Sequence, residues 1–160
     1  MKKIFVLSSL LLISCAGGKN YIQKEEKRRA RLEMQSIMDM LYTREIPPVE
    51  FEFNSATLRK SSHKILDMIA ELLLRHRTMK LVVVGHTDDV GSEEYNKSLS
   101  LNRAQAVKDY IVSKGVYPTS IRIYGYGESR PVTREQTEKA RALNRRVEFI
   151  LTTREWETVY

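Results

Sequence analysis

The chain contains a single cysteine among its 160 residues, and this scarcity excludes several kinds of protein. One thiol forms no intramolecular disulfide and supplies no cysteine-based zinc or iron–sulfur cluster. Four prolines and seven glycines are too few for a collagen-like or low-complexity chain. No apolar run is long enough to cross about 30 Å of hydrocarbon as a helix. With 42% hydrophobic and 29% charged residues, the composition is that of one globular domain with a short additional segment.

Acidic residues are also in short supply. Lys and Arg number 27 against 20 Asp and Glu, which gives a formal net charge of +7 at pH 7. A basic surface suits anionic partners such as cell-wall glycan, acidic lipid or nucleic acid. No zinc finger, recognition helix or aromatic-rich binding sheet accompanies the charge, so we expect no nucleic-acid partner.

The position of the lone cysteine indicates its use. Two lysines precede the apolar residues 4–13, a pattern typical of a secretory signal peptide. Residues 12–15, LISC, resemble the lipobox of bacterial lipoproteins. That resemblance implies removal of residues 1–14, diacylglycerol on the thiol of Cys15 and acylation of the new amine, as by palmitate. Ala16, which follows, implies export to the outer membrane. The alternative is an ordinary signal peptide with a chance cysteine.

The mature chain is predicted to have three parts. Residues 15–46 comprise the lipidated cysteine, a flexible tether over 16–20 and a charged helix. Residues 47–153 form one domain, because Pro47 and Pro48 end the helix, and residues 154–160 are left as a tail. Four apolar residues have the spacing of an amphipathic helix: Met34, Ile37, Met38 and Leu41. The basic stretch within this helix is either a surface for the membrane or wall, or a solvated spacer, which we favour.

The domain alternates between strand and helix patterns. The expected elements are a strand over 49–53, a helix capped by Ser61 or Ser62 and running through Leu73, a strand over 81–84, a helix over 92–114, a strand over 121–124, a helix over 137–143 and a strand over 146–152. This β-α-β-α-β-α-β order in a small domain predicts an α+β, two-layer sandwich with helices packed on a sheet. The order of the strands does not follow from the pattern.

Three charged residues interrupt the apolar patterns. Arg103 lies four residues after Leu99 and four before Val107, within the apolar stripe of its helix. Arg145 has the parity of the core-facing residues of the last strand. Asp88 follows a buried strand, where loops of helix-on-sheet folds often bind ligands.

Together these residues would form a pocket with one anionic and two cationic poles. Such a pocket complements a zwitterion, with an ammonium at Asp88 and a carboxylate at the planar fork of Arg103 or Arg145. The alternative is that Asp88 pairs with one of the arginines in a stabilising network. Spacing alone leaves both possibilities open.

An ordered set of short motifs spans this domain: Phe51-Glu-Phe-Asn-Ser55, Gly85-His-Thr-Asp88, Gly91, Tyr95-Asn96, Leu99-Ser100, Arg103-Ala104, Gly115-Val116, Gly125-Tyr-Gly127-Glu128, Pro131 and Asn144-Arg-Arg-Val147. Over about residues 47–152 the chain resembles the OmpA-like peptidoglycan-binding domain. With the lipobox, it resembles the peptidoglycan-associated lipoprotein (Pal) branch of that family. The resemblance implies a four-stranded mixed sheet with helices on one face.

The resemblance also implies a ligand, the diaminopimelate side chain of the peptidoglycan stem peptide. Carried over by position, Asp88 takes the ammonium, Arg103 the carboxylate, and Arg145 supports the carboxylate pole. Three further residues are implied to line the pocket through side chains or backbone groups: Asn54, Thr87 and Asn96. The implied protein is an outer-membrane lipoprotein, lipid-anchored with its domain facing the periplasm, that tethers the membrane to the wall.

Two other functions compete with this one. A cell-wall hydrolase would use His86, Asp88 and Asp89, but one loop supplies two metal ligands where three or four are needed. No nucleophile–base arrangement accompanies them, so we expect no enzyme, no metal and no cofactor. The Pal resemblance alternatively implies an envelope scaffold with Tol-type partners.

Overall fold

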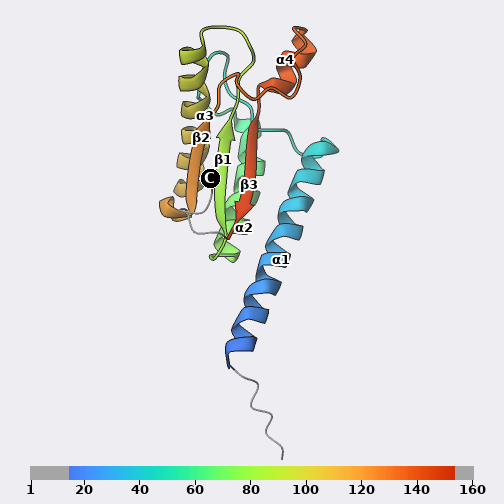
Figure 1. Ribbon diagram of the computed structural model, residues 1–160, viewed down its shortest axis with the longest axis vertical. Coiled ribbons are helices and arrows are strands. Elements are labelled where there is room, and N and C mark those ends of the chain that lie inside the picture. The colour runs from blue at the N-terminus through green and yellow to red at the C-terminus, as the bar shows by residue number, and fades with distance from the viewer. Residues whose placement is uncertain (1–14, 154–160) are drawn as a thin grey trace, which may run out of the picture.

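The computed structural model describes residues 15–153 and has an α+β fold (Figure 1). The helices and strands are α1 (Cys15–Tyr42), α2 (His63–Arg75), β1 (Lys80–Gly85), α3 (Glu93–Ser113), β2 (Ile121–Gly125), α4 (Glu138–Asn144) and β3 (Val147–Thr152). Short 3-10 turns over Lys60–Ser62 and Pro118–Ser120 precede α2 and β2. From the expected strand over 81–84 onward, the helices and strands follow the order expected from the sequence.

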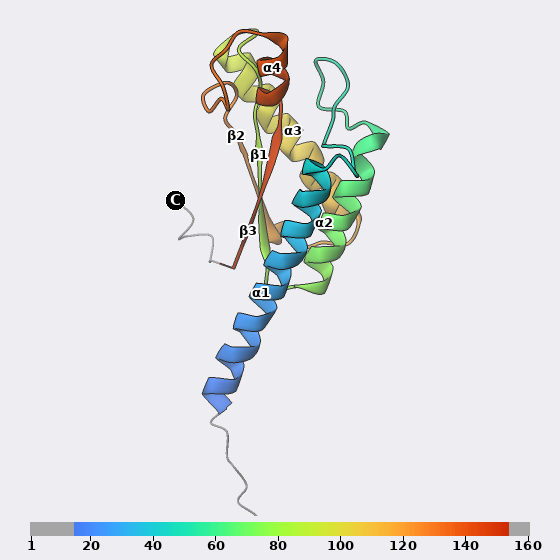
Figure 2. The same cartoon turned by 90° about the vertical axis from the view of Figure 1, so that its right-hand side faces the viewer.

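The sheet is mixed, with the strand order β2-β1-β3. The central strand β1 runs parallel to β2 and antiparallel to β3. Leu81 pairs with Ile121 on one side and with Leu151 on the other, and Val83 pairs with Phe149 in the same register. Because side chains alternate along a strand, these residues share the face that joins the core. Helices α2 and α3 lie over this face, and α1 packs against α2 (Figure 2).

The expected four-stranded sheet is wrong, because among the described residues the sheet has three strands. Residues 49–53, expected as the first strand, contribute only an isolated antiparallel bridge between Phe51 and Leu58. The chain reverses at Asn54, which has a φ of +49°. The period-two pattern therefore belongs to a small turn that pairs with itself. We call residues 51–58 the hairpin.

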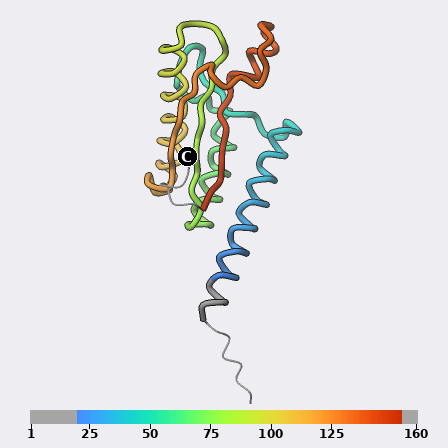
Figure 3. The backbone as a smooth tube through the Cα atoms, viewed as in Figure 1, coloured from blue at the N-terminus to red at the C-terminus, as the bar shows by residue number. Residues whose placement is uncertain are grey.

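Helix α1 extends further than expected. It begins at Cys15, so residues 16–20, expected as a flexible tether, lie within the helix. Its later turns bury Ala30, Met34 and Ile37 against the domain. Helix formation is cooperative, so turns stabilised by this packing favour extension toward the N-terminus. The first half of α1 projects beyond the domain (Figure 3).

Polar contacts reinforce the packing of α1 on α2. Glu33 lies 3.0 Å from the guanidinium of Arg75 and 3.2 Å from Nε2 of His76. Burial would raise the pKa of Glu33, but hydrogen bonds from His76 and Arg75 lower it below its usual value. Within residues 15–153, no helix is long and apolar enough to span a membrane.

Helix α3 approaches the sheet at two glycines. A Cβ at Gly85 would lie 2.9 Å from the carbonyl carbon of Ser100, and one at Gly125 would lie 2.7 Å from Cα of Leu101. The buried side of α3 accordingly carries small and polar residues beside its apolar ones: Asn96, Ser100, Ala104, Val107 and Ile111. This close contact fixes the start of α3 beside the loop that leaves β1.

Candidate functional site

The loop after β1 is held from both sides at the end of the molecule opposite the start of α1 (Figure 1). The backbone N–H of Thr87 donates to the carbonyl of Gly127 at 3.0 Å. The buried side-chain amide of Asn96 donates to the carbonyl of Asp88 at 3.3 Å and to Glu128 at 2.6 Å. Thr87 is also buried, and its hydroxyl donates to the carbonyl of Asp88. Both side chains thus face protein groups and position the Asp88 backbone.

The Asp88 carboxylate is itself fixed in place. Its Oδ2 lies 2.8 Å from Nη1 of Arg145, and its Oδ1 accepts the N–H of Val90 at 3.2 Å. Arg145 also pairs with Glu138 at 2.6 Å. The hydrogen bond with Asp88 is the main cause that raises the pKa of Arg145. The sequence left open an ion pair between Asp88 and one of the two arginines, and the structure shows this pair with Arg145.

Arg103 has a different environment. Its half-buried side chain donates from Nε to the carbonyl of Ser55 at 3.0 Å and lies 5.1 Å from the ring centre of Phe51. Within the described part of the chain, the guanidinium forms no ion pair. Burial lowers its pKa, although the charge of Asp88 opposes this effect and that of Arg145 adds to it. A half-buried cation that no carboxylate of the described residues pairs with therefore stands near an Asp88–Arg145 pair.

The hairpin completes this region through Asn54, whose side-chain oxygen accepts a hydrogen bond from the hydroxyl of Tyr95 on α3. The structure thus gathers Asn54, Asp88, Arg103 and Arg145 around the first turns of α3. A cavity of about 180 Å³ adjoins Asp88. Its lining comprises Thr87, Asp88, Asp89, Glu128, Pro131, Thr133, Arg134, Glu135, Gln136 and Asn144. Neither Arg103 nor Arg145 belongs to that lining.

Sequence reasoning missed the partners that hold the arginines. The carbonyl of Ser55 and the ring of Phe51 could not be assigned to Arg103, because they reach it from a distant segment. Glu138 lies about two helical turns before Arg145, which caps the same helix, so its spacing was a signal that could have been used. Tyr95 belonged to a recognised motif but received no role. Only the tertiary fold brings the hairpin to α3.

The residues of the hydrolase alternative are dispersed. Asp89 pairs with Arg141 at 2.8 Å, which lowers the pKa of Asp89. His86 is buried, its ring nitrogens have no hydrogen-bond partner, and its Nε2 lies 3.5 Å from Glu148. In residues 15–153, no three His, Cys, Asp or Glu side chains are grouped to hold a metal ion.

Known protein sequences are similar to this chain over most of the domain. Residues 50–145 match the OmpA family. The chain is 38% identical to the peptidoglycan-associated lipoprotein of Pseudomonas aeruginosa over 114 residues, 71% of this chain and 67% of that protein. It is 41% identical to outer membrane porin F of Pseudomonas fluorescens over 62% of this chain. The chain spans about a third of that porin and 51% of outer membrane protein A of Bordetella avium.

Solved structures have the same fold. The peptidoglycan-associated lipoprotein of Burkholderia pseudomallei superposes with a TM-score of 0.62 at 29% identity, covering 65% of this chain and 88% of that one. The C-terminal domain of MotB from Helicobacter pylori gives a TM-score of 0.61 at 25% identity. That match covers 68% of this chain and 86% of the MotB chain.

Proposed function

The chain belongs to the OmpA family, and from that premise we propose that it is an outer-membrane lipoprotein whose domain binds peptidoglycan non-covalently and tethers the membrane to the wall. It is a binding protein and not an enzyme, as are its peptidoglycan-associated relatives. The ligand that we propose is the diaminopimelate side chain of the stem peptide.

The observation that carries this proposal is the uncompensated charge of Arg103. An unpaired, half-buried cation is costly unless an anion reaches it. A diaminopimelate side chain ends in a carbon that bears both an ammonium and a carboxylate. The carboxylate would pair with the free Nη groups of Arg103, while its Nε stays bonded to Ser55. The ammonium would then lie toward Asp88, whose charge already acts on Arg103.

The Asp88–Arg145 pair does not prevent this binding. A carboxylate has about four acceptor positions, and Asp88 uses one for Arg145 and one for the N–H of Val90. The remaining positions can accept an ammonium. Arg145 would orient Asp88 and add positive charge near the ligand carboxylate, which supports its expected role at that pole.

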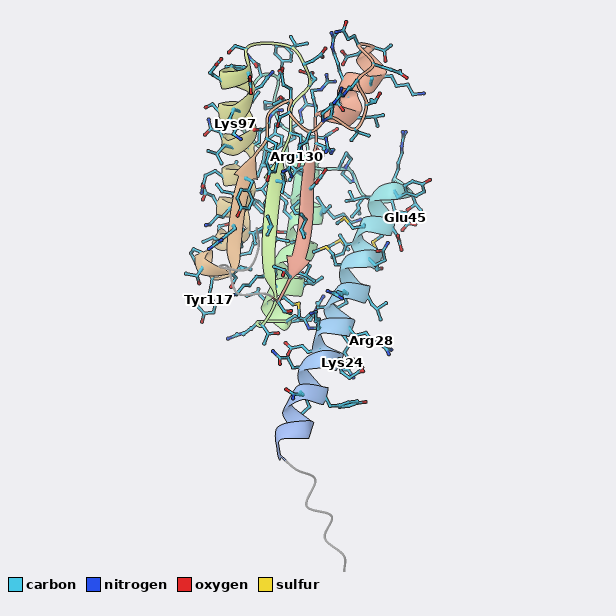
Figure 4. All side chains as sticks on the ribbon, in the orientation of Figure 1. Lys24, Arg28, Glu45, Lys97, Tyr117 and Arg130 are labelled. Carbon is cyan, nitrogen blue, oxygen red and sulfur yellow. The ribbon has the colours of Figure 1, made fainter. Side chains whose placement is uncertain are left out.

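The arm supports a tethering role. We propose that the mature chain starts at a lipidated Cys15, whereas residues 1–14 lie outside the described residues. At about 1.5 Å per residue, the 28 residues of α1 extend about 42 Å. Lys24 and Arg28 lie on its projecting half (Figure 4), and the wall-binding groups lie at the other end of the molecule. One lipid-anchored chain would therefore hold the wall at a fixed distance from the membrane.

Binding is tested with two muropeptides that differ in one group. Lysine is diaminopimelate without the side-chain carboxylate, so calorimetry should give about tenfold to hundredfold weaker binding for the lysine form. Arg103→Met should bind both forms equally weakly and thereby abolish the preference. Arg77→Met removes an exposed arginine in the turn between α2 and β1 and should retain the preference. Equal wild-type affinity for both muropeptides would contradict the role of Arg103.

The anchor needs a separate experiment in a Gram-negative host. Wild type should incorporate a clickable palmitate analogue and fractionate with the outer membrane. Cys15→Ser should lose the label, whereas Ser9→Ala, in the same leader, should retain it. A labelled Cys15→Ser protein, or an unlabelled wild type, would overturn the proposed lipid anchor without bearing on wall binding.

A further inference from the structure

The hairpin has an internally bonded tip. The N–H of Glu52 donates to the carbonyl of Thr57 at 2.9 Å, and the N–H of Ser55 donates to the carbonyl of Glu52 at 3.1 Å. The hydroxyl of Ser55 accepts the N–H of Thr57 at 2.9 Å. Phe53, at the tip, is 95% exposed and adds nothing to the core. The base of the hairpin packs against the core through Phe51 and Leu58, so the orientation of the bonded tip depends on further contacts.

Helix α3 provides those contacts through two side chains. Tyr95 donates its hydroxyl to the side-chain oxygen of Asn54, and Arg103 donates from Nε to the carbonyl of Ser55. The second contact also orients Arg103, because Nε is bonded and the two Nη groups of the planar fork point elsewhere. A shift of the hairpin tip would consequently change the direction of the guanidinium.

Tyr95 is well placed to hold the tip. It lies in the first turn of α3, where its N–H donates to the capping hydroxyl of Ser92 at 3.2 Å. Its ring lies beside Gly91, which has a φ of +111°, and a Cβ there would be 3.4 Å from Cδ1 of Tyr95. The helix cap thus fixes the backbone of this residue, and its ring, although 42% exposed, lies close to Gly91.

We propose that Tyr95 is a positioning residue of the wall-binding site, which acts through Asn54 by holding the hairpin against α3. This keeps the carbonyl of Ser55 on Nε of Arg103 and leaves the Nη groups for the ligand carboxylate. The inference rests on the proposed function for its effect on affinity. The contact between Tyr95 and the hairpin stands independently of any ligand.

The first test is Tyr95→Phe, which removes only the hydroxyl. Titration with the diaminopimelate muropeptide should show about threefold to tenfold weaker binding, the effect of one lost hydrogen bond. Tyr117→Phe is the matched control, since Tyr117 is 64% exposed and lies at the other end of the domain (Figure 4). Wild-type affinity in Tyr95→Phe would overturn the proposal.

A double-mutant cycle distinguishes positioning from direct contact. If Tyr95 acts through Asn54, Tyr95→Phe should have no further effect on affinity in an Asn54→Ala background. Independent, additive effects would mean that the Tyr95 hydroxyl touches the ligand, and would overturn the positioning role.

Amide hydrogen exchange of the ligand-free protein completes the test. Tyr95→Phe should accelerate exchange at Glu52, Ser55 and Thr57, while Tyr117→Phe should not. Unchanged exchange would overturn the contact itself. If the wild type binds no muropeptide, the proposed function and the effect on affinity both fail. Faster exchange in Tyr95→Phe would still support the contact between Tyr95 and the hairpin.

Discussion

Helix α3 contacts two regions that are held together in opposite ways. On the side of the sheet, Val107 and Ile111 are fully buried and the backbone at Ser100 leaves no room for a side chain at Gly85. Along its other side, from Tyr95 to Arg103, α3 faces partly exposed polar groups, and within the described residues the guanidinium of Arg103 has no ion-pair partner. The first region excludes water, and the second retains charge that its own partners do not neutralise.

This difference separates stability from binding. Close packing contributes through area removed from water and fails when volume changes by a single methyl group. The polar contacts of the site contribute little to folding, because exposed ion pairs are worth about 0–1 kcal/mol. Substitutions in the packed region should therefore unfold the domain, whereas substitutions in the charged region should change binding with little loss of stability.

Gly85→Ala should have the largest effect. The new Cβ would collide with the carbonyl group of Ser100, which is backbone and cannot rotate away. We expect a loss of more than about 3 kcal/mol in the free energy of unfolding, or no folded protein. Gly115→Asn is the comparison, because no atom lies within 4 Å of a Cβ there and only the backbone strain at its φ of +98° remains, which should cost about 1–2 kcal/mol. Equal stability of the two variants in urea would contradict the close contact.

Ile37→Asp tests the packing of α1 on α2. A carboxylate would replace a side chain that is 5% exposed, so we expect a loss of about 2–4 kcal/mol in urea unfolding. Ser36→Asp adds the same charge at an exposed position and should cost less than about 0.5 kcal/mol. Muropeptide affinity at 25 °C should be unchanged in both, because Ile37 packs in the apolar core and not among the polar residues of the site. A binding defect confined to Ile37→Asp would show that the packing of α1 is coupled to the site.

Regular patterns predicted the helices and the three paired strands, because the helices and outer strands bury one face and β1, a continuous apolar run, is buried on both. It predicted a fourth strand at 49–53 because a short turn that pairs with itself has the same alternation as an edge strand. The deciding feature was the left-handed backbone of Asn54. A single asparagine does not reveal such a conformation within an alternating run.

The charged residues of the site were predictable as anomalies, but their partners were not. Arg103 violated the apolar stripe of its helix, and Asp88 followed a buried strand. Which arginine pairs with Asp88 depends on where the end of α4 meets the β1 loop, and no local pattern encodes that distance. The buried side of α3 also differs from the apolar stripe: Leu99 is only half-buried, whereas Ser100 and Ala104 are buried, and the close approach at Gly125 favours a small residue at position 100.

His86 lies between the two regions and should make stability depend on pH. Burial, with the charge of Arg146, lowers the pKa of His86 below its ordinary 6.5, although Glu148 opposes this. Below pH 6.5 the unfolded chain therefore binds more protons than the folded one, and stability falls as pH falls. The urea midpoint should therefore decline between pH 7.5 and 5.5. His86→Phe should flatten this decline, and an unchanged slope would refute the assignment.

The smallest effect is expected from a comparison of the two arginines themselves. Arg145→Met breaks partly exposed pairs with Asp88 and Glu138, so it should cost up to about 1 kcal/mol of stability, and less in 1 M salt. Arg103→Met removes a charge that no carboxylate of the described chain pairs with, while its stem can still pack on Phe51. It also loses the hydrogen bond from Nε to the carbonyl of Ser55, so its stability should change by no more than about 1 kcal/mol and should not depend on salt. Because the same substitution is made at both positions, the loss of side-chain length is matched, and the salt-dependent part of the difference isolates the ion pairs. A larger loss of stability in Arg103→Met than in Arg145→Met would mean that Arg103 serves folding, and that its charge is not held in reserve for a ligand.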